Sequence, residues 1–182
     1  MDSIMKGKSI MMAVMFFVGT VTEMKAQAIE EDLDAKYATE LVKPGTEAPD
    51  FELKTPDGDT FKLSSLKDHV IVLDFWASWC SDCRKDAPEV VELYNTYHPK
   101  GVEFVGISMD TNIEAWQKAI KQYGIEYLQV SELKKFKETD ISKAYGIKWI
   151  PSLVVIGKDG KVLLSTVLSE KVGKLLKELT SK

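Results

Sequence analysis

The chain has 182 residues, 45% of them hydrophobic and 29% charged, and its formal net charge at pH 7 is −4. This length suits one domain with a full hydrophobic core and is short for two domains, and the composition is ordinary for a soluble globular protein. The acidic balance and the lack of a basic stripe argue against a nucleic-acid-binding protein, and two cysteines are too few for a disulfide-stapled scaffold.

The first 28 residues have the pattern of an export signal. Lys6 and Lys8 precede a mostly apolar stretch of twelve residues, 10–21, and Ala-Gln-Ala at 26–28 offers a small-x-small cleavage site. Twelve residues are too few to span a bilayer core, which takes about 20. We therefore expect residues 1–28 to be a cleaved signal peptide, with an uncleaved anchor or a disordered tail as the alternative. The protein would then act in the periplasm or an equivalent extracytoplasmic compartment, where a disulfide can persist.

Residues 29–43 are charged and form either a linker or a short helix, and the domain itself is expected to cover residues 44–182. It opens with a predicted β-hairpin, in which strands at 51–53 and 60–63 flank a Pro-Asp-Gly-Asp turn.

Beyond this hairpin, predicted strands alternate with predicted helices. Further strands are expected at 70–76, 102–108, 127–130, 152–156 and 162–164. Helices are expected at about 80–98, 112–123, 141–145 and 169–179. Strands that alternate with helices and end in a hairpin indicate an α/β sandwich with a mixed central sheet.

The two cysteines, Cys80 and Cys83, stand where the strand at 70–76 gives way to a helix. Unpaired N–H groups and the positive end of the helix dipole would stabilise a Cys80 thiolate there, and Cys83 returns to the same face. This arrangement predicts thiol–disulfide exchange. Structural zinc is less favoured, because such a site needs about four ligands and neither His69 nor His98 is expected near the thiols.

Asp74 interrupts the otherwise apolar strand that leads to the cysteines. Burial of an unpaired carboxylate raises its pKa, toward values at which it exchanges protons near neutrality. Asp74 would then act as a general acid/base that takes the proton from Cys83 as this thiol attacks a mixed disulfide. The alternative is a strand-edge aspartate in water.

The sequence DFWASWCSDC at 74–83, with Pro88 five residues after the second cysteine, resembles the active-site segment of thioredoxin. AYGIKWIPS at 144–152 resembles the thioredoxin segment that carries a cis-proline facing the disulfide. GTEAPDF at 45–51 resembles the exported TlpA/ResA branch of the thioredoxin-like superfamily. The resemblance implies a three-layer α/β sandwich: a mixed central β-sheet flanked by helices, with an N-terminal β-hairpin and a central α/β insertion at about 112–130.

By the same resemblance, Cys80 is the exposed attacking thiol, Cys83 the resolving thiol and Asp74 the buried carboxylate. Three further residues match positions that contact substrate: Trp79, Ile150 and Pro151. The backbone of Ile150, before the cis-proline Pro151, would pair with an extended substrate strand.

The dipeptide Ser-Asp between the cysteines departs from the Gly-Pro of thioredoxin. Asp82 should disfavour the Cys80 thiolate, whereas Arg84 and Lys85 should favour it. A less stable thiolate goes with a more reducing couple, so we expect a reductant rather than an oxidant.

The expected activity is therefore that of a thiol–disulfide oxidoreductase that reduces exported proteins and needs no metal or organic cofactor. Its partners would be protein thiol/disulfide substrates, such as apocytochrome c or other exported proteins, and an upstream electron donor. No nucleic acid is expected, and the membrane would be met only through an uncleaved signal.

Two other functions remain open at this stage. The first is a thiol peroxidase, because the opening Ala-Pro-Asp-Phe also resembles peroxiredoxins, although the segment before Cys80 lacks the proline and threonine of a peroxidatic site. The second is a redox-inactive binding module, with a surface patch formed by Trp79, Trp149 and Ile150.

Overall fold

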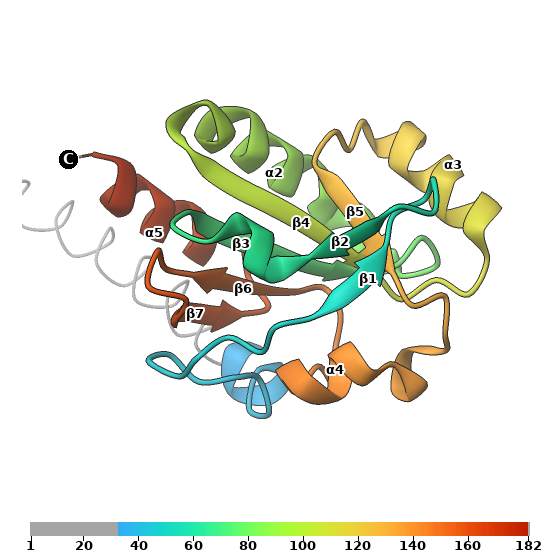
Figure 1. Cartoon of the computed structure of the whole chain (residues 1–182), viewed down its shortest axis with the longest axis horizontal. Coiled ribbons are helices and arrows are strands. Elements are labelled where there is room, and N and C mark those ends of the chain that lie inside the picture. Colours follow the sequence, from blue (N-terminus) through green and yellow to red (C-terminus); the bar gives the residue numbers. More distant parts are fainter. Residues whose placement is uncertain (1–32, 182) are drawn as a thin grey trace, which may run out of the picture.

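The structure is a computed structural model that describes residues 33–181, so the predicted signal peptide at 1–28 lies outside the described residues. Within them, a seven-stranded mixed sheet has the order β2-β1-β5-β4-β3-β6-β7 (Figure 1). The strands are β1 (Glu52–Lys54), β2 (Thr60–Lys62), β3 (Val70–Trp76), β4 (Val102–Ser108), β5 (Leu128–Ser131), β6 (Ser152–Ile156) and β7 (Val162–Thr166). The predicted hairpins and the mixed sheet are confirmed.

Helices cover both faces of this sheet, which confirms the predicted α/β architecture. The helices are α2 (Ser81–Tyr97), α3 (Ile113–Tyr123), α4 (Asp140–Tyr145) and α5 (Ser169–Thr180). Figure 1 shows α2 and α5 on one side of the sheet and α4 on the other, where it lies beside the first described residues. Among residues 33–181, no helix has the length and apolar character that crossing a membrane requires.

Strand β3 lies near the middle of the sheet and carries the chain to the cysteines. It is parallel to β4 and antiparallel to β6, and all seven of its residues are buried. A strand that is covered on both faces needs a continuous apolar sequence, which explains the run of apolar residues at 70–76. The sequence positions that follow β3 are therefore held by the best-packed part of the core.

The segment before the hairpin is folded onto the domain. Residues 33–37 are helical, Leu41 is buried, and the N–H of Val42 donates to the carbonyl oxygen of Tyr145 at 3.1 Å. Gly146, in the left-handed region at φ 67°, caps α4 at a point where a Cβ atom would collide with the carbonyl of Glu40. The described part of the charged N-terminal segment is thus a short helix with a packed extension.

Candidate active site

The two cysteines form a disulfide at the N-terminus of α2. Cys80 is the N-cap residue, one position before the helix, and its Sγ accepts the backbone N–H of Cys83 at 3.1 Å. This contact satisfies one of the donors that every helix start leaves unpaired, and it would stabilise a thiolate on Cys80 after reduction. Cys80 is 8% exposed and Cys83 4%, so Cys80 is the more exposed residue of the pair, although less exposed than expected.

The loop before β6 meets the disulfide from the other side. The Ile150-Pro151 peptide bond is cis, as the thioredoxin resemblance implies, and the carbonyl oxygen of Ile150 lies 3.5 Å from Cys80 Sγ. The side chain of Ile150 is buried, so the expected surface patch contains Trp79 and Trp149 but not Ile150. The backbone carbonyl of residue 150 nevertheless lies beside Cys80, and its pairing with an extended substrate stays a prediction.

Asp74 is buried in β3, an interior strand of the sheet, so the alternative of a solvated strand-edge aspartate is wrong. The hydroxyl of Tyr127 donates to Asp74 Oδ2 at 2.8 Å. Burial raises the pKa of Asp74 to about 7; the Tyr127 hydrogen bond lowers it in part, and the nearby Asp86 raises it further. At neutral pH the carboxyl is therefore divided between its two protonation states, the condition that suits a group exchanging protons.

Asp74 and the buried thiol share one small cavity. The cavity has a volume of about 10 Å³. Its lining includes Asp74, Cys83, Asp86, Tyr127 and Pro151. A space of this size holds about one water molecule. Asp74 and Cys83 thus face the same cavity, as the predicted proton transfer between them requires.

Asp86 is a second carboxyl in this cavity, and the sequence analysis missed it. Ser169 Oγ donates to its Oδ1 at 2.5 Å, while its buried Oδ2 has no hydrogen-bond partner among residues 33–181. Burial raises the pKa of Asp86, the Ser169 hydrogen bond lowers it in part, and Glu89 raises it. Its spacing from Cys83, three residues along a helix that buries this face, is the signal that could have identified it.

The charges around Cys80 partly compensate one another. Asp82 forms an ion pair with Lys85 at 3.0 Å, and both side chains are exposed. Arg84 Nη1 instead donates to the carbonyl of Ser78 at 3.4 Å, behind the cysteine. Lys85 should therefore reduce the predicted effect of Asp82 on the Cys80 thiolate, whereas negative charge on Asp74 or Asp86, in the cavity that Cys83 lines, should add to it.

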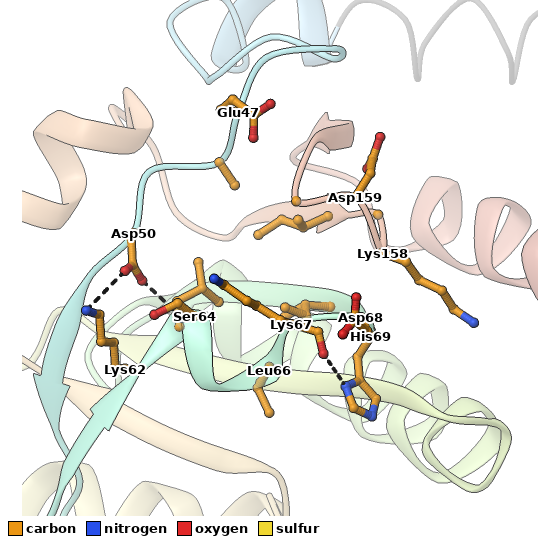
Figure 2. Close-up of a pocket in the computed structure, with 16 residues that line it drawn as sticks. Glu47, Asp50, Lys62, Ser64, Leu66, Lys67, Asp68, His69, Lys158 and Asp159 are labelled. Carbon is orange, nitrogen blue, oxygen red and sulfur yellow. Dashed lines mark hydrogen bonds and ion pairs between the residues drawn. The ribbon is translucent and has the colours of Figure 1, made fainter.

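A wider groove lies where β3 begins, at the opposite end of that strand from the disulfide, and Figure 2 shows the side chains that line it. It has a volume of about 670 Å³ and carries side chains of both charge signs. Its Asp50 pairs with Lys62 at 3.6 Å and accepts the N–H of Ser64 at 3.0 Å. None of the residues predicted to act in catalysis lines this groove, so the redox site is confined to the end of the sheet where β3 meets α2.

Comparisons with known proteins agree with this geometry. The AhpC/TSA family matches residues 44–165. The thiol-disulfide oxidoreductase ResA of Bacillus thuringiensis is 32% identical over 143 residues, which cover 79% of this chain and 80% of that protein. The thioredoxin domain of a Bacteroides vulgatus thiol-disulfide oxidoreductase has a TM-score of 0.70 at 26% identity, over 77% of this chain and 99% of that one. For a Bacteroides fragilis thiol-disulfide oxidoreductase the TM-score is 0.69 at 30% identity, over 74% and 99%.

Proposed function

We propose that this chain reduces disulfides of exported proteins outside the cytoplasm. It belongs to the AhpC/TSA family and is a thiol-disulfide oxidoreductase of the thioredoxin-like, TlpA/ResA type. The observation that carries the proposal is the position of the Cys80–Cys83 pair, at a helix N-terminus and above a cavity with two carboxyls of raised pKa.

The reduced protein would act in two exchange steps. The Cys80 thiolate attacks one sulfur of the substrate disulfide, forms a mixed disulfide and releases the other substrate sulfur as a thiolate. Cys83 then loses its proton toward Asp74 and attacks Cys80 Sγ, which releases the second substrate sulfur and forms the Cys80–Cys83 disulfide. The substrate gains two electrons, and an upstream donor must supply two electrons to restore the dithiol.

The charges at the site support a reductant. Strong oxidants stabilise their reduced form, chiefly through the thiolate. Here Asp82 stands two residues after Cys80, and Asp74 and Asp86 lie beside Cys83. Negative charge disfavours both thiolates, so electrons are released more readily to a substrate.

The N-terminal sequence supports a place of action outside the cytoplasm. The basic flank, the apolar stretch at 10–21 and the Ala-Gln-Ala site at 26–28 together have the pattern of a secretory signal. An exported reductant needs a dedicated electron donor, since its compartment tends to keep disulfides oxidised. Its substrates would be exported proteins with a disulfide to be opened, and apocytochrome c is one such class.

The reduction potential tests the direction. It is measured by equilibrating the protein in defined thiol/disulfide buffers and following Trp79 fluorescence, because Trp79 is 55% exposed and adjoins Cys80. A value near or below about −230 mV is expected for a reductant. A value between about −120 and −180 mV would make the protein an oxidant or isomerase and would overturn the proposed direction.

A thiol peroxidase is the second candidate, because the Ala-Pro-Asp-Phe opening lies within the segment that matches the AhpC/TSA family. Against it stand the sequence before Cys80 and the pairing of Cys80 with a cysteine one helical turn away. Peroxide consumption by the reduced protein, with Cys80→Ser as control, separates the two activities: rapid consumption that the substitution abolishes would favour the peroxidase.

A further inference from the structure

A groove opens beside the redox site on the side of Pro151. Its volume is about 410 Å³, and its apolar walls are formed by Leu33, Tyr37, Trp149, Pro151 and Val167. This is at the small end of the range for ligand pockets and suits one or two side chains rather than a whole cofactor. Because Leu33 and Tyr37 belong to the segment before the family match, this wall is a feature that the active-site motif does not predict.

Two aromatic rings define the groove. Tyr37 stacks on Trp149, with ring centroids 4.3 Å apart and an angle of 24° between the ring planes. Trp149 is 37% exposed, whereas Tyr37 is half-buried. The tyrosine therefore supports one face of a tryptophan that remains open to solvent, and it limits the orientations of that ring.

The segment that carries Tyr37 is itself held in place. Asp34 accepts hydrogen bonds from Thr166 Oγ1 at 2.9 Å and from the N–H of Val167 at 2.8 Å, and it pairs with Lys171 at 2.8 Å. Leu41, on the other side of Tyr37, is 2% exposed. Tyr37 is thus fixed at both ends of its segment, as a preorganised wall requires.

We propose that Tyr37 is a positioning residue that holds Trp149 as the wall of a subsite for an apolar side chain, next to the reactive cysteine of a protein substrate. This proposal rests on the proposed function in one respect: it assumes that the substrate is a polypeptide whose cysteine reacts with Cys80. Pro151 and Asp86 line both this groove and the cavity that Cys83 lines, so the groove adjoins the redox site.

The course of a bound substrate and the charges of the groove favour an apolar occupant. Cys80 Sγ lies 3.5 Å from the Ile150 carbonyl oxygen, and Pro151, the next residue, lines the groove, so a side chain next to a cysteine joined to Cys80 would lie at the groove. At the groove, Lys85 and Asp82 neutralise one another at 3.0 Å, and Asp86, the third charged residue that lines it, accepts a hydrogen bond from Ser169 and has a pKa raised by burial, which favours its neutral form. A large aliphatic or aromatic side chain is therefore accommodated better than a charged one.

The test compares two disulfide-bonded peptides that differ only in the residue beside the cysteine, phenylalanine or serine, with glutathione disulfide as a small substrate. The wild type should prefer the phenylalanine peptide by about tenfold or more in kcat/KM, the usual size of an apolar-pocket effect. In Tyr37→Ala this preference should fall to about twofold through KM, while the rate with glutathione disulfide and the reduction potential stay unchanged. Tyr37→Phe, which keeps the stacked ring, should behave like the wild type.

Leu179→Ala is the matched control, because Leu179 is 38% exposed at the far end of α5 and should leave the preference intact. If Tyr37→Ala does not fold, Trp149→Ala should show the same loss. Equal rates for both peptides with the wild type would overturn the proposal, as would a loss in Tyr37→Ala that extends to glutathione disulfide. If the protein instead oxidises the reduced peptides, the same preference in that direction supports the subsite while refuting the proposed reductant.

Discussion

Replacing Asp74 by asparagine should change how the stability of the protein depends on pH. Burial raises the pKa of Asp74 from 3.8 to about 7. Between these values the folded protein keeps the proton that the unfolded chain has lost, so the free energy of unfolding falls as pH rises, and it is constant on either side. At about 1.4 kcal/mol for each pH unit, Asp74 lowers the free energy of unfolding by about 4 kcal/mol between pH 4 and pH 7.

Asparagine does not titrate, so Asp74→Asn should become more stable relative to the wild type by about 4 kcal/mol over this range. Urea unfolding of the oxidised proteins at several pH values between 4 and 8 measures the difference. Tyr127→Phe is the matched variant, because it removes the hydrogen bond that lowers the pKa of Asp74 and should extend the loss of stability to higher pH. A difference between Asp74→Asn and the wild type that does not change with pH would refute this reasoning.

The same substitution should slow one chemical step and leave the other. A positioned general base contributes about 10²–10⁴-fold, so release of substrate from the mixed disulfide should slow by about 100-fold at pH 7. The loss should shrink as pH rises and Cys83 ionises without help. Rapid-quench measurement of the mixed disulfide separates its formation by Cys80 from its resolution. Equal slowing of both steps would show that Asp74 acts through the fold and not as a base.

Three further outcomes are expected. Replacing Ser81-Asp82 by Pro-His should raise the reduction potential, measured in glutathione buffers, and an unchanged potential would count against the role given to Asp82. Asp86→Asn should lower the pKa of the Cys83 thiol in the reduced protein, followed by alkylation rates from pH 5 to 10; an unaltered pKa would mean that Asp86 does not act on this thiol. Gly146→Ala should destabilise the protein by about 1–3 kcal/mol, because an αL position and the carbonyl of Glu40 both exclude a Cβ atom; thermal unfolding that matches the wild type would contradict this.

Much of the fold was predictable because its signals are local. The apolar run at 70–76 matches β3 residue for residue, and Gly124 ends α3 in the left-handed conformation that a helix C-cap favours. The cysteine pair was predictable for the same reason, since its position depends only on where a strand ends and a helix begins. Cys80, the first residue of the expected helix, lies one residue outside the observed helix α2 because its sulfur serves as the cap.

The rest of the site depends on contacts between distant parts of the chain. Tyr127 reaches Asp74 across 53 positions of sequence, and Ser169 reaches Asp86 across 83. Neither tyrosine nor serine carries a local sign of such a partner. The segment around Tyr37 was left open between linker and helix because its packing depends on Asp34 reaching β7 and α5, which local periodicity does not reveal.

The burial of β3 on both faces has a consequence for how such a protein can diversify. Asp74 lies in this strand, and Cys80 and Cys83 stand at the start of the helix that follows it; all three are buried, so their positions tolerate little change. Trp79, Asp82 and Trp149 stand at the rim, exposed and outside that core. Substitutions there cost little stability. By the proposals made above, substrate choice and redox poise depend on this rim, so we expect both to change by substitution there while the framework is kept.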